Sequence, residues 1–83
     1  MDRAEFVEMH ESCVSALGAY FIEAEKTTQM LAECTAEPLT FTERFNLMSQ
    51  GIAENDAHLT YLGTKSLLYR AARLGYGTTY LRH

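Results

Sequence analysis

Two long stretches of this chain carry apolar side chains at alternating steps of four and three residues, and the chain's single proline stands between them. Such steps place side chains on one face of an α-helix, which has about 3.6 residues per turn. Pro38 biases the residue before it away from helical geometry, so a helix must end there. The sequence therefore predicts an all-α chain in which two helices, joined by a short connection, form a long antiparallel hairpin.

Capping residues predict where the two helices begin and end. Asp2 is a good N-cap, so the first helix should run from about residue 3 to about residue 34. Thr40 and Glu43 have the spacing of a capping box, which starts the second helix at about residue 41. Gly75 follows the last apolar residues, and a glycine commonly ends a helix, so the second helix should end at about residue 74.

Gly51 is the weak point of the second helix. A glycine inside a helix costs about 1 kcal/mol relative to alanine, and a break there would give a three-helix bundle instead. We favour one continuous helix because the apolar spacing keeps its phase across Gly51. Residues 1–75 then form a single helical-hairpin domain, and residues 76–83 form a C-terminal tail.

Both helices carry more apolar surface than one neighbouring helix covers. In the first helix, a row that contains Leu17 is flanked by a second row that contains Val14. The row of the second helix is Phe41, Phe45, Met48, Ile52, Asn55, Leu59, Leu62, Ser66 and Tyr69. Because a chain of 83 residues buries too little surface to be very stable alone, we expect a homodimer, a dimeric four-helix bundle.

The expected interface draws on these apolar rows and on aromatic residues of the tail. Its residues are Phe6, Val14, Leu17, Phe21, Phe45, Ile52, Leu59, Leu68, Tyr76 and Tyr80. Asn55 interrupts the row of the second helix. In an antiparallel hairpin, residues whose numbers sum to about 75 lie side by side, so Asn55 could hydrogen-bond Tyr20. Alternatively, it fixes the register of an oligomer, as a buried asparagine can.

His10 and Cys13 are the weak candidates for a metal site. They lie three residues apart on the apolar face and could supply two ligands, but no third ligand is evident at their level. A buried, neutral His10 bonded to Tyr69 or Ser66 is the simpler interpretation. No catalytic triad and no phosphate-binding loop is present, so we predict no catalytic residue, no enzyme activity and no cofactor.

The charge of the chain argues against nucleic acid as the main partner. The net charge is −4, whereas binding to phosphate backbones depends on basic residues. Residues 1–41 carry eight acidic and two basic side chains, and residues 42–83 carry three acidic and five basic ones. A nucleic-acid accessory protein that uses Lys65, Arg70 and Arg73 is therefore the weakest alternative.

Cysteine spacing and hydropathy indicate a compartment. Cys13 and Cys34 lie on one predicted helix about 30 Å apart, too far for a disulfide, which suits the reducing cytoplasm. No apolar stretch approaches the roughly 20 residues of a membrane span. We therefore expect a cytoplasmic, non-catalytic helical module that binds protein, as an adaptor, small chaperone or regulator. A ligand- or metal-binding bundle around His10 and Cys13 is the alternative.

Overall fold

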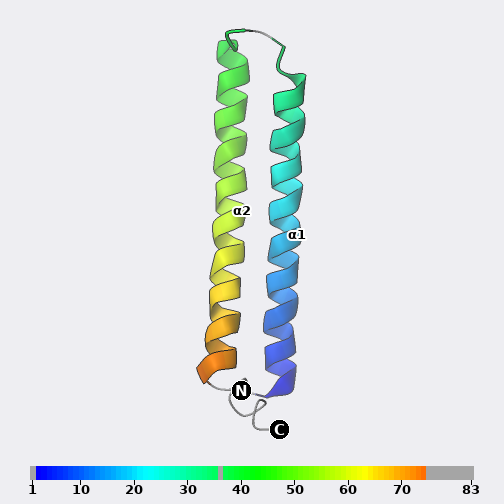
Figure 1. Cartoon of the computed structure of the whole chain (residues 1–83), viewed down its shortest axis with the longest axis vertical. Coiled ribbons are helices and arrows are strands. Elements are labelled where there is room, and N and C mark those ends of the chain that lie inside the picture. Colours follow the sequence, from blue (N-terminus) through cyan, green and yellow to red (C-terminus); the bar gives the residue numbers. More distant parts are fainter. Residues whose placement is uncertain (1, 36, 75–83) are drawn as a thin grey trace.

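Residues 2–35 and 37–74 are described by a computed structural model, in which two long helices lie antiparallel (Figure 1). Helix α1 spans Arg3–Glu33 and helix α2 spans Phe41–Leu74. The molecule is a narrow rod with extents of 60 × 16 × 15 Å. The predicted all-α hairpin is confirmed, and both helices end within one residue of the expected positions.

The predicted caps are formed by side chains at the start of each helix. The Asp2 carboxylate accepts a hydrogen bond of 2.8 Å from the Glu5 N–H. At α2, the Thr40 N–H donates to the Glu43 carboxylate at 2.9 Å, and the Glu43 N–H donates to the Thr40 hydroxyl at 3.1 Å. This reciprocal pair satisfies two backbone N–H groups that the helix itself cannot. The bond from the Thr40 N–H also holds the pKa of Glu43 below its usual value near 4.5.

Helix α2 continues without a break through Gly51, so the three-helix alternative is wrong. A glycine weakens a helix, but contacts along the whole length of α1 offset that cost. A Cβ atom added at Gly51 would meet no other atom within 4 Å. The glycine is therefore not required by a close approach of the two helices.

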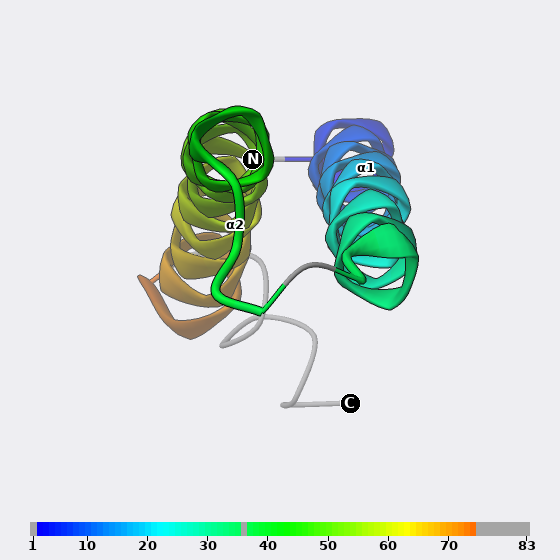
Figure 2. The ribbon, with the colours of Figure 1, turned by 90° about the horizontal axis from the view of Figure 1, so that it is seen from above.

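The contact between the helices uses one row of residues from each. The inner row of α1 is Phe6, Met9, Cys13, Ala16, Tyr20, Glu23, Thr27, Met30 and Cys34. The inner row of α2 is Glu43, Leu47, Gln50, Glu54, Ala57, Tyr61, Thr64, Leu68 and Ala71. These residues are buried or half-buried, and both rows repeat at steps of three and four. Seen end on, the described residues form two helices side by side with no third helix over them (Figure 2).

The row predicted for α2, from Phe41 to Tyr69, does not face α1, which corrects our expectation. We call it the outer row: Phe41, Phe45, Met48, Ile52, Asn55, Leu59, Leu62, Ser66 and Tyr69. It begins two residues before the inner row, and two residues turn a helix by about 200°. The outer row therefore lies on nearly the opposite side of α2. The inner row contains small residues such as Ala57 and Ala71, which let the two helices approach.

Candidate interaction surface

The outer row of α2 is a largely apolar surface whose hydrophobic side chains are exposed in the described part of the chain. Ile52 is 71% exposed and Met48 is 69% exposed. The other exposed hydrophobic residues of the row are Phe41, Phe45, Leu59, Leu62 and Tyr69. By contrast, Cys13 and Leu68 are the two described hydrophobic residues below a tenth exposure. The hairpin therefore leaves more of its large apolar side chains in solvent than it buries.

Helix α1 extends this apolar surface on one side of the hairpin. Val7, Val14 and Phe21 repeat at steps of seven and are all exposed. Val14 lines a groove together with Leu17 of α1 and with Tyr69 of the outer row. The exposed row of α1 and the outer row of α2 therefore come together at this groove, through Val14 and Tyr69.

The expected interface residues fall into three groups. Phe6 and Leu17 are half-buried and Leu68 is buried, so these three already contribute to the contact within the hairpin. The exposed members are Val14, Phe21, Phe45, Ile52 and Leu59. Tyr76 and Tyr80 lie outside the described residues.

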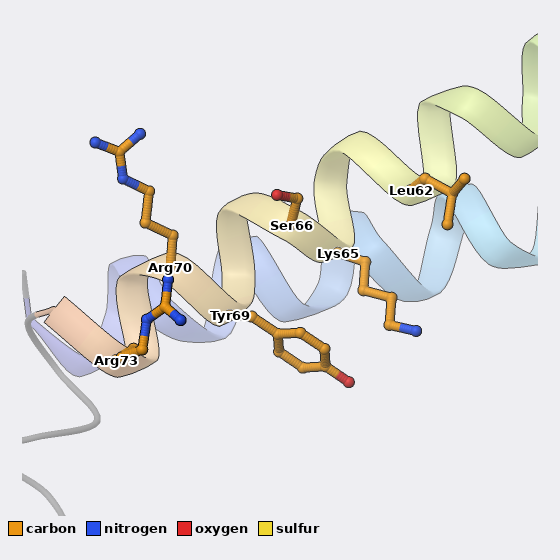
Figure 3. A pocket seen from close by; sticks show the side chains of 6 residues that line it. All are labelled: Leu62, Lys65, Ser66, Tyr69, Arg70 and Arg73. Carbon is orange, nitrogen blue, oxygen red and sulfur yellow. The ribbon is translucent and has the colours of Figure 1, made fainter.

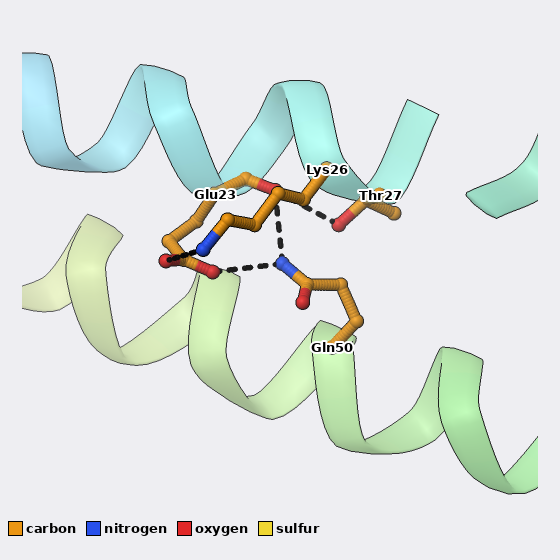
Figure 4. A network of polar contacts seen from close by, with 4 residues as sticks. All are labelled: Glu23, Lys26, Thr27 and Gln50. Carbon is orange, nitrogen blue, oxygen red and sulfur yellow. Dashed lines mark hydrogen bonds and ion pairs between the residues drawn. The ribbon is translucent and has the colours of Figure 1, made fainter. Parts of the chain in front are cut away.

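A polar clamp joins the inner rows in the part of the rod nearer the turn (Figure 4). The Gln50 amide donates to the Glu23 carboxylate at 2.8 Å and to the Glu23 backbone carbonyl at 3.0 Å. Lys26 lies 3.2 Å from the same carboxylate. The hydrogen bond from Gln50, with that from Lys26, lowers the pKa of Glu23 below its usual value near 4.5. These directed bonds fix how the two helices align.

A stacked aromatic pair lies further along the contact. The rings of Tyr20 and His58 are 4.7 Å apart and inclined by 24°. This pair corrects the interpretation that Tyr20 bonds Asn55, because Asn55 is exposed on the other side of α2. The numbers of Tyr20 and His58 sum to 78 and those of Glu23 and Gln50 to 73, so the predicted register was right within a helical turn.

The inner row of α2 is the feature that sequence reasoning missed. It has the same alternating spacing as the outer row but mixes Leu47 and Leu68 with polar residues such as Gln50. The sequence contains this row as a second periodic pattern, shifted by two residues from the outer row. The outer row is more hydrophobic, so the sequence favours it as the face toward the first helix.

The basic end of α2 borders the outer row (Figure 3). Leu62, Lys65, Ser66, Tyr69, Arg70 and Arg73 line an open groove there, all from this one helix. The Lys65 ammonium lies 5.8 Å from the ring centre of Tyr61 and 5.6 Å from that of Tyr69. Such distances suit cation–π attraction. The small side chain of Ser66 leaves the gap between its larger neighbours.

The metal candidates His10 and Cys13 line the groove between the helices that Val14 and Tyr69 also line. The two candidates differ in their exposure to solvent. Cys13 is buried and His10 is exposed, so the interpretation of His10 as a buried histidine is wrong. Among residues 2–35 and 37–74, no group of three or more His, Cys, Asp or Glu side chains could hold a metal ion. Cys34 is free and half-buried, and burial together with the nearby Glu43 carboxylate raises the pKa of its thiol.

No family model, curated protein or solved structure matches this chain. Within the described part of the chain, neither helix combines the length and the hydropathy that crossing a membrane requires. The chemistry of the described surfaces is therefore what bears on function.

Proposed function

We propose that this protein is a non-catalytic helical interaction module whose binding surface is the outer row of α2. This surface binds a second copy of the chain, which gives a homodimer with four helices. The observation that carries the proposal is the exposure of seven large hydrophobic residues along the outer row. Contiguous apolar patches of this kind usually mark interaction sites.

The apolar surface of the outer row runs along most of α2. It begins at Phe41, the first residue of the helix, and ends at Tyr69, five residues before the last one. Covering it would also supply the hydrophobic stabilisation that the thin contact between α1 and α2 lacks.

The cysteines support a cytoplasmic location for such a module. Cys13 and Cys34 are both free and lie at different levels of α1. Unpaired thiols are usual in a reducing compartment and uncommon in secreted small domains.

The test is the molar mass in solution across a dilution series, measured by light scattering for the protein and for two variants. Ile52→Lys places a charge in the outer row, at a position 71% exposed in the single hairpin. Ala53→Lys adds the same charge one residue later, about 100° around the helix. We expect two chains per particle for the protein and for Ala53→Lys, and dissociation for Ile52→Lys. A protein that stays a monomer at every concentration would refute the homodimer.

A further inference from the structure

We infer that the second copy docks antiparallel on the outer row, with a two-fold axis beside Asn55 that brings the Asn55 amides of the two copies together. This inference rests on the proposed function, since it specifies how the same surface is occupied. Three features of the described residues carry it: the symmetry of the row, its gap at Ser66, and the basic residues at one end of α2.

The outer row is symmetric about Asn55. Phe41 and Tyr69 lie 14 residues to either side of it, and Met48 and Leu62 lie seven residues to either side. A two-fold interface is self-complementary, because each residue contacts a residue of the other copy that contacts it in return. Rotation about Asn55 therefore places aromatic residues against each other at both ends of the interface and aliphatic residues against each other between them.

The small residue Ser66 leaves a gap in the outer row, and the large residue Phe45 can fill it in the second copy. Ser66 lies eleven residues after Asn55, and Phe45 lies ten residues before it. Antiparallel docking brings Phe45 of the second copy over the groove around Ser66, which Leu62 and Tyr69 border (Figure 3). Phe45 is 59% exposed in the single hairpin, so its ring is available to fill that groove. Large side chains inserted between their neighbours are the usual mode of helix packing.

The basic residues beside the outer row favour the antiparallel direction. Lys65, Arg70 and Arg73 border the groove around Ser66, whereas Glu43 and Glu54 lie in the inner row, away from this surface. Parallel docking would bring the basic residues of the two copies together, and like charges across an interface disfavour a complex. Antiparallel docking places them at opposite ends of the interface.

Asn55 lies at the centre of this interface and fixes the register of the two copies. It is one of two polar residues in a row that is otherwise apolar, and it makes no hydrogen bond to Tyr20 within the hairpin. A buried asparagine that pairs with its own copy fixes the register of two helices, at some cost in stability. Without that pair, the repeating apolar residues would allow the two helices to slide by one heptad.

The axis is tested by charge complementation. We expect Asn55→Asp and Asn55→Lys each to weaken the dimer about 100-fold, because like charges a few ångströms apart repel in the interface. A mixture of the two variants should form a heterodimer whose Kd is within about tenfold of the unaltered dimer. The matched pair Thr60→Asp and Thr60→Lys changes an exposed residue about 100° around α2 from Leu59 of the outer row, and it should leave the dimer Kd unchanged. Analytical ultracentrifugation measures all of these.

The direction is tested by a second mixture. Antiparallel docking predicts that Met48→Asp is rescued by Leu62→Lys and not by Met48→Lys, whereas parallel docking predicts the reverse. Rescue by Met48→Lys, or Asn55 variants that dimerise like the unaltered protein, would overturn the inference and leave self-association intact. A monomeric unaltered protein would overturn the proposed function itself, so the two failures are distinguishable.

Discussion

Substitution of two adjacent leucines tests which side of α2 faces α1. Leu68 is 8% exposed, whereas Leu67 is 57% exposed. Leu→Ala at a buried site costs about 2–5 kcal/mol. For Leu68→Ala we expect a loss of about 2–3 kcal/mol in the free energy of unfolding, at the lower end of this range. The contact between the two helices is thin, so few tightly packed atoms surround the leucine. Leu67→Ala removes the same atoms from solvent-facing surface and should change stability by no more than about 0.5 kcal/mol.

The two variants are compared by thermal unfolding, followed by circular dichroism at one protein concentration. For a chain of this size, 1 kcal/mol shifts the melting temperature by about 4–8 °C, so Leu68→Ala should melt about 10–20 °C lower. The melting temperature for Leu67→Ala should stay within a few degrees of the unaltered protein. Equal losses for both variants, or a larger loss for Leu67→Ala, would refute the assignment of the inner row.

Three further substitutions test other parts of the hairpin. Leu17→Asp puts a charge at a half-buried site on α1 and should abolish helicity measured by circular dichroism; an unchanged melt would contradict this. Gly51→Ala adds a methyl group that meets no atom within 4 Å and should raise the melting temperature by about 4–8 °C. Glu23 has a lowered pKa when folded, so its stabilisation holds above pH 4.5 and is lost as the pH falls. Glu23→Gln should therefore lose less stability between pH 7 and pH 3 in urea titrations.

The helix boundaries could be predicted because they depend on neighbouring residues. Asp2 bonds to a backbone N–H three residues away, and Thr40 and Glu43 bond to each other. Pro38 acts on the residue before it. Each of these effects lies within one helical turn, so the sequence carries it directly.

The orientation of α2 could not be predicted for a different reason. Two rows with the same spacing compete on this helix, and periodicity alone does not say which one faces α1. The more apolar row, which contains Ile52, was the stronger candidate. Specific contacts across the hairpin select the other side of α2: Gln50 hydrogen-bonds Glu23, and His58, which follows Ala57 of the inner row, stacks on Tyr20. Such long-range partners are set by three-dimensional fit and leave no local pattern.

The best-buried contact of the hairpin lies far from the turn that joins its helices. Cys13 and Leu68 line one groove although 55 residues separate them, whereas the clamp joins Glu23 and Gln50 across 27 residues. The entropy of closing a loop rises by only about 0.6 kcal/mol per doubling of its length. The two helices are thus joined by the turn at one end and held by this buried contact near the other end. The rate at which the Cys13 thiol reacts with a thiol reagent should therefore measure how often the helices separate at the end far from the turn.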